Sequence, residues 1–200
     1  MLREYTFTPR FTLIVNHLKA LRTLREYVNG VGLEKDMQGF FNYLQQDLSR
    51  SVFRPAGWED LYVESNTLYS SPKSPNPKSS SPKSTWRVVK DDFIAIEVYP
   101  AGPLDDDYEP FVNLYVPLKW KKRSQFIAKL KAPSGFQHVS QFSDGEQDER
   151  NTITRYIPYT SYIGAEGLFD TTGFIGAFGE ATKALVAMEK DIDGILGHLA

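Results

Sequence analysis

The sequence contains no cysteine, and histidine occurs only at positions 17, 138 and 198. Without cysteine there can be no disulfide, thiolate-ligated zinc or iron–sulfur centre, and no thiol catalysis. The three histidines lie on separate segments, and none has the spacing of a zinc-binding H-E-x-x-H helix. We therefore expect neither a metal nor a cofactor.

Long apolar runs and an excess of one charge are also missing. No stretch approaches the ~20 apolar residues that a membrane-spanning helix needs, and the charged beginning of the chain, broken by Pro9, does not resemble a secretory signal. The 23 basic and 25 acidic residues give a net charge of -2, so nothing global attracts nucleic acid. These absences predict a cytoplasmic protein with no membrane partner.

Aromatic side chains are plentiful: they make up 14% of the 200 residues, and hydrophobic residues as a whole make up 41%. Large rings bury much area each, so a chain of this length can enclose a substantial core. We expect a single domain that spans residues 1–200.

Two helices are predicted at the beginning of the chain. Apolar residues recur at steps of three and four from Phe11 to Val28, after a Thr8-Pro9 start signal and before Asn29-Gly30. A second such stripe runs from Leu33 to Leu48 and ends before the Arg54–Gly57 turn. Because the connection is short, the two helices are expected to be antiparallel neighbours.

The segment 70–85 is the one stretch of low complexity, with four prolines, three lysines and many serines. Proline removes backbone donors and serine is well solvated, so an exposed loop within the domain is expected. It is interpreted either as a tolerated insertion, which we favour, or as a docking or phosphorylation segment.

The middle of the chain reads as a sheet. Residues 58–69 form one bent strand or two short ones, and further strands are predicted at 86–89, 93–99, 111–116, 136–142 and 152–159, with a polar hairpin loop at 143–151. The predicted fold class is α+β: two N-terminal helices, a mainly antiparallel sheet of five to six strands, a short basic helix and a long C-terminal helix packed on the sheet.

The final helix carries the clearest pattern. Its apolar residues follow one another at alternating steps of four and three: Phe174, Phe178, Ala181, Leu185, Met188, Ile192, Ile195 and Leu199. This spacing predicts one continuous helix from Thr172, capped by Asp170, Thr171 or Thr172. The stripe either packs on the sheet, which we favour, or forms a coiled-coil seam in a homodimer.

The segment 119–131 is predicted to be the basic helix, because it carries six cations and no acidic residue. Held by Phe126 and Leu130, it would turn Lys119, Lys121, Lys122 and Arg123 outward, with Trp120 as a stacking platform for bases. Acidic clusters precede and follow this segment in the sequence. They support a second interpretation, in which the basic helix simply presents a solvated charged face.

Glu97 stands among apolar residues in a predicted strand, where a carboxylate is costly unless it is paired or functional. A nuclease-like metal site would place a lysine two residues later, and this chain has Tyr99 there. We expect Glu97 to face solvent or to pair with Arg87.

No catalytic constellation emerges from these residues. The favoured hypothesis is a non-enzymatic protein-binding domain of the inhibitor, immunity or adaptor type, acting through an aromatic and charged surface that includes Tyr156, Tyr159 and Tyr162. The alternative is a nucleic-acid-binding or nuclease-like domain that uses the basic helix 119–131 and Glu97.

Overall fold

The computed structural model describes residues 17–58, 62–64, 67–72, 86–89, 92–103, 109–138, 141–143, 146–148 and 151–199. The chain divides into two compact units, of which the first ends at Asn42 and the second begins at Tyr43. Whether both units fold as one domain stays a prediction.

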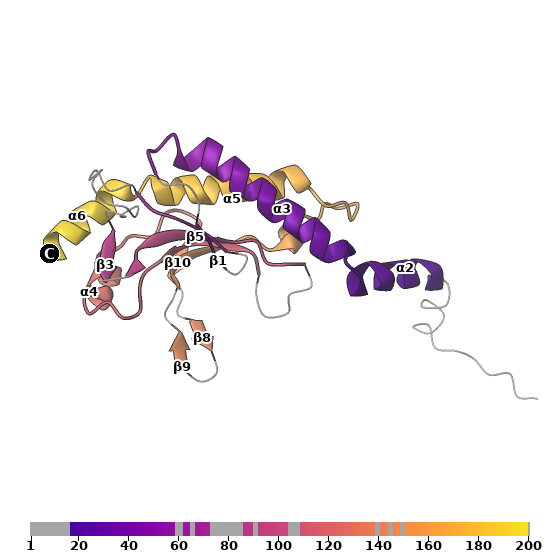
Figure 1. Cartoon of the computed structure of the whole chain (residues 1–200), viewed down its shortest axis with the longest axis horizontal. Coiled ribbons are helices and arrows are strands. Elements are labelled where there is room, and N and C mark those ends of the chain that lie inside the picture. Colours follow the sequence, from indigo (N-terminus) through magenta and orange to yellow (C-terminus); the bar gives the residue numbers. More distant parts are fainter. Residues whose placement is uncertain are drawn as a thin grey trace, which may run out of the picture. The chain divides into compact units, whose positions relative to one another are not determined.

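The first unit contains the predicted helices, α2 (Leu18–Asn29) and the beginning of α3 (Gly32–Leu48). They follow one another end to end (Figure 1), so the predicted antiparallel pair is wrong. The Tyr27 hydroxyl donates to Asp36 Oδ2 at 2.7 Å across the connection, and this bond raises the pKa of Tyr27. Leu24 of the predicted apolar stripe is exposed. The predicted start at Thr8 lies outside the described residues.

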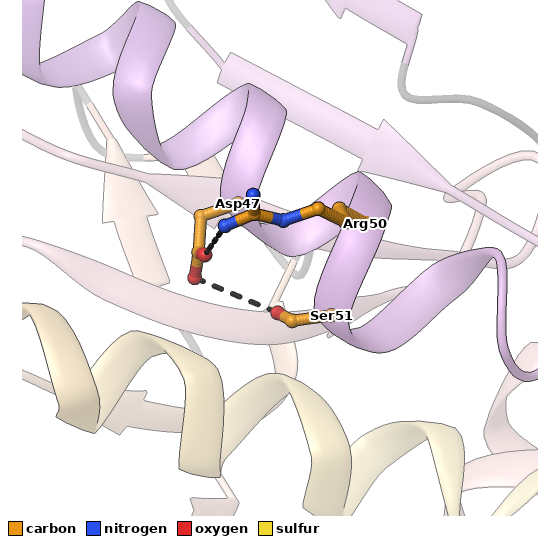
Figure 2. A network of polar contacts seen from close by, with 3 residues as sticks. All are labelled: Asp47, Arg50 and Ser51. Atoms are coloured by element: carbon orange, nitrogen blue, oxygen red, sulfur yellow. Dashed lines mark hydrogen bonds and ion pairs between the residues drawn. The ribbon is translucent and has the colours of Figure 1, made fainter.

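In the second unit, α3 continues into a π-helix, η1 (Ser49–Phe53). Asp47 accepts hydrogen bonds from Arg50 at 3.3 Å and from the Ser51 hydroxyl at 3.5 Å across this change of pitch (Figure 2). Exposed pairs of this kind add little stability. The burial of Phe53 holds the segment more firmly, and Gly57 then turns the chain with a φ of 76°.

A six-stranded sheet forms the centre of the second unit. Every pairing in it is antiparallel, in the order β1 (Tyr62–Glu64), β2 (Thr67–Ser70), β5 (Ala95–Tyr99), β6 (Phe111–Tyr115), β10 (Asn151–Tyr156) and β7 (Gln137–His138). Two small hairpins lie outside it: β3 (Arg87–Val89) with β4 (Asp92–Phe93), and β8 (Gln141–Ser143) with β9 (Glu146–Asp148). The predicted α+β class with an antiparallel sheet is confirmed.

Three local predictions can be compared with this sheet. Residues 58–69 contain two short strands, as one alternative had it. The polar loop 143–151 holds β9, which pairs with β8 instead of forming a simple turn. Of the predicted exposed loop 70–85, the structure describes residues 70–72, and all three are buried because β2 extends to Ser70 and Pro72 bridges to Trp58. The loop boundary was therefore placed too early.

One face of the sheet is apolar and lies under a helix. The register brings Leu68 beside Val98 and pairs Ile96 with Leu114, all fully buried. Helix α5 (Thr171–Val186) packs on β5, β6 and η1, and Figure 1 shows it running across this face. Burial of such side chains supplies the main favourable term in folding.

The C-terminal stripe is buried as expected except at Ile195, which is half-buried, but the predicted continuous helix is wrong. Helix α5 ends at Val186, and α6 (Glu189–Leu199) begins after a turn at Ala187-Met188. Met188 N–H donates to the Leu185 carbonyl three residues back, which tightens the backbone and breaks the helical pattern. The predicted N-terminal cap is present, since Asp170 Oδ1 accepts from Gly173 N–H at 2.9 Å. The stripe is buried within its own chain, so a homodimer through this seam would require opening the core.

Two buried tryptophans explain where α6 lies. The Trp58 indole donates to Glu189 Oε2 at 2.7 Å, and the Trp86 indole donates to Asp193 Oδ1 at 2.8 Å. The two carboxylates are one helical turn apart on α6, and the two rings meet edge to face with centroids 4.9 Å apart. This tryptophan pair therefore fixes the rotation and position of α6.

Gly176 offers a test of α5 itself. It is exposed in the helix, and a Cβ added there would meet no atom within 4 Å. We expect Gly176→Ala to raise the free energy of unfolding by about 0.5–1 kcal/mol, because alanine loses less backbone entropy in a helix. Urea unfolding followed by circular dichroism measures the change, and a decrease would mean that α5 is not helical at this position.

Candidate functional site

The predicted basic helix is shorter than its sequence suggested. Residues 118–122 form turns, with Trp120 N–H donating to the Pro117 carbonyl and Arg123 N–H to the Trp120 carbonyl, and α4 runs only over Arg123–Lys129. The boundaries 119–131 are therefore wrong, because the chain after Pro117 closes two successive turns before it becomes helical.

Only part of the predicted cationic face is exposed. Arg123 is buried and its Nε donates to the Val116 carbonyl at 3.2 Å, while Lys122 Nζ bonds the Leu199 carbonyl at the end of α6. Trp120 is half-buried, with its ring 5.4 Å from that of Phe126. These three side chains hold the fold together instead of presenting a surface to phosphates. Lys119 and Lys121 remain exposed.

The three predicted tyrosines do not form one surface. Tyr156 lies on β10 in register with Phe111, on the sheet face opposite α5. Tyr159 and Tyr162, in the short helix η2 (Tyr159–Tyr162), instead pack against Phe174 of α5, with ring centroids 4.5 and 5.4 Å away.

Tyr159 has a structural role. Its hydroxyl donates to the Ala101 carbonyl at 2.9 Å, and burial raises its pKa to about 12. A hydroxyl that keeps its proton well above neutral pH is a hydrogen-bond donor and not a base.

A more compact surface follows directly after η2. In the segment Ile163–Phe169, which we call the apolar loop, Ile163 and Phe169 form a β-bridge and Gly164 N–H donates to the Leu168 carbonyl at 2.8 Å. Gly167 takes a φ of 73°, a left-handed conformation that glycine adopts without strain. Asp170 N–H closes the loop onto the Tyr162 carbonyl at 2.7 Å. Backbone bonds thus fix its shape.

The apolar loop exposes large hydrophobic side chains. Ile163 is 50% exposed, Leu168 69% and Phe169 43%. The ring of Phe169 still contacts Phe174 and Tyr159, with centroids 5.2 and 5.8 Å away, so the loop is anchored on α5 and η2. Our sequence reasoning missed this surface. The available signal was a pair of apolar positions flanking Gly-Ala-Glu-Gly and lying outside the helical stripe.

Glu97 belongs to a polar row on the sheet face opposite α5. The register aligns Tyr69 with Glu97, Asn113, Thr154 and finally Gln137 across five strands. Glu97 was expected to face solvent or to pair with Arg87; it is half-buried, and its Oε1 accepts a cross-strand hydrogen bond from the Tyr69 hydroxyl at 3.0 Å. Thr154 is fully buried, and its Oγ1 has no hydrogen-bond partner among the described residues.

Neither a metal cluster nor a membrane span is found in the part of the chain that the structure describes. No three histidine, aspartate or glutamate side chains converge there as metal ligands. No helix in the same ranges has the length and apolarity to cross a bilayer. Among the described residues, therefore, no group of carboxylates gathers around Glu97 to support the nuclease-like alternative.

Comparison with known proteins found no matching family model, no similar curated protein and no similar solved structure. An α+β fold by itself is compatible with many functions. Function therefore has to be argued from the surfaces of this chain.

Proposed function

We propose that this protein is a non-enzymatic protein-binding domain of the inhibitor, immunity or adaptor type, and that it binds its partner through the apolar loop Ile163–Phe169. The observation that carries the proposal is the exposure of three large apolar side chains on a segment fixed by backbone hydrogen bonds. Several large apolar side chains exposed on one short segment favour an interaction site.

The rigidity of the apolar loop supports binding. Its ends are joined by the Ile163–Phe169 bridge and by the bond from Asp170 to Tyr162, and Phe169 rests on Phe174. A preorganised surface loses less conformational entropy when a partner docks. Tyr162 lies half-exposed beside it, and aromatic residues are enriched among those that dominate binding energy.

The composition of the apolar loop indicates the chemistry of the partner. Glu166 is its only charged residue, so a protein surface with an apolar hollow fits it better than a polyanion. The nucleic-acid alternative loses support, because Lys122 and Arg123 bond to carbonyls within the fold. The cytoplasmic location expected from the sequence stays part of this proposal.

Partner binding can be tested with the double variant Ile163→Ser/Leu168→Ser. A partner is captured with the intact chain from its native host, and its affinity for each variant is then measured by titration calorimetry. We expect the double variant to bind at least 10-fold more weakly, because hot-spot side chains are each worth about 2 kcal/mol or more. Its stability should change little, since both side chains are half-exposed or more.

Leu118→Ser provides the matched control, because Leu118 is 47% exposed outside the apolar loop. We expect it to bind within about twofold of the unaltered chain, as substitutions outside an interface usually do. Unchanged affinity in the double variant, or an equal loss in Leu118→Ser, would contradict the proposal.

A further inference from the structure

A cavity of about 450 Å³ lies between the end of α4 and one side of α6. Lys129, Leu130 and Lys131 line it from the α4 side. On the α6 side the lining residues recur at helical spacing, from Met188 through Asp191 and Ile195 to His198. We call this cavity the α4–α6 groove. Its volume is in the range of small-molecule sites.

The rim of the α4–α6 groove is positively charged. Lys129, Lys131 and Lys190 line it, against the single carboxylate of Asp191. Within the described residues, no hydrogen bond or ion pair engages the three ammonium groups. Like charges gathered around one concave surface attract an anion.

His198 adds a directed group to this rim. Its Nδ1 lies 2.6 Å from the Gly194 carbonyl. A carbonyl oxygen only accepts, so Nδ1 carries the proton and Nε2 is left on the other side of the ring. The bond to the helix backbone holds the imidazole in place.

The floor of the α4–α6 groove is apolar. Leu130 and Met188 are buried there and Ile195 is half-buried. Gly194 lies between them without a side chain, and a Cβ added to it would meet no atom within 4 Å. A glycine inside a helix is unfavourable relative to alanine, and here it leaves the groove open.

We propose that the α4–α6 groove binds a small amphipathic organic anion, a carboxylate, phosphate or sulfonate carried on an aliphatic or aromatic body. The lysines would neutralise the anionic group while Leu130, Met188 and Ile195 cover the apolar body. This binding activity is independent of the proposed protein-binding function, because the groove shares no residue with the apolar loop.

The probe for this test is 8-anilino-1-naphthalenesulfonate, an anionic group on an aromatic body, titrated into the intact chain by calorimetry and fluorescence. We expect one site with a Kd on the order of tens of micromolar, the range for a ligand of this size. Gly194→Leu fills the groove and should weaken binding at least 10-fold. Gly197→Leu should leave it unchanged, because Gly197 is an exposed α6 glycine that does not line the groove and is equally uncrowded.

Charge is tested separately. Lys129→Glu/Lys190→Glu should weaken binding at least 10-fold, whereas Lys183→Glu, on an exposed lysine of α5, should not. These surface substitutions are expected to leave the fold intact. The uncharged N-phenyl-1-naphthylamine and inorganic phosphate should each bind far more weakly than the sulfonate.

Equal binding by Lys129→Glu/Lys190→Glu and the unaltered chain would overturn the proposal, and so would three further results. The first is equal binding by Gly194→Leu and the unaltered chain. The second is a loss of binding in the Gly197→Leu control that equals the loss in Gly194→Leu. The third is loss of probe binding in the Ile163→Ser/Leu168→Ser variant, because this result would place the binding site of the probe on the apolar loop.

Discussion

Leu185→Asp is expected to abolish cooperative folding of the second unit. Leu185 is fully buried on α5, where the helix packs on β5, β6 and η1. The substitution removes apolar contacts and buries a carboxylate in an apolar environment that, among the described residues, offers it no ion-pair partner. Each of these effects costs several kcal/mol. Since a whole domain is stable by only about 5–15 kcal/mol, the sum approaches the total. Circular dichroism during urea unfolding measures the loss.

Ala187→Asp is the control for Leu185→Asp. It introduces the same side chain two residues away, at an exposed position in the turn between α5 and α6. Its free energy of unfolding should stay within about 0.5 kcal/mol of the unaltered chain. Light scattering adds a second measurement: a folded, monomeric Leu185→Asp obtained from a dimeric parent would show that the stripe is an intermolecular seam and contradict the fold.

Trp86→Phe is expected to lower the free energy of unfolding by about 2–3 kcal/mol. The substitution leaves a void at a fully buried position, weakens the edge-to-face contact with Trp58 and removes the indole donor to Asp193. The bond to a partly exposed carboxylate should account for about 1 kcal/mol of this.

A double-mutant cycle separates the hydrogen bond from the packing. Combining Trp86→Phe with Asp193→Ala should give a coupling energy of about 1 kcal/mol, because either change alone already breaks the bond. The same cycle with Asp191→Ala should give no coupling, since Asp191 is another exposed acid of α6, and among the described residues the indole bonds go to Glu189 and Asp193. Zero coupling with Asp193 would show that the tryptophan pair does not hold α6 by hydrogen bonding.

The two surfaces proposed for binding differ in how far the sequence indicated them. Lys129 and Lys131 belong to a basic run that was recognised, but their partners Lys190 and His198 are some 60 residues away in the chain. Only the packing of α4 against α6 brings them around one cavity. The apolar loop was not recognised, because Ile163, Leu168 and Phe169 look like ordinary core residues until their exposure is known.

Periodicity and composition determined the fold class of this protein and the approximate positions of most of its helices and strands. The three-and-four spacing from Phe174 to Leu199 identified a buried face, since a side chain's direction follows directly from its position in a helix. Tertiary structure alone decided where α5 ends, because a stripe spaced by three and four continues through a one-turn break. It also decided which charged groups face solvent. Arg123 is buried because its side chain donates a hydrogen bond to the Val116 carbonyl, and sequence spacing does not encode this bond.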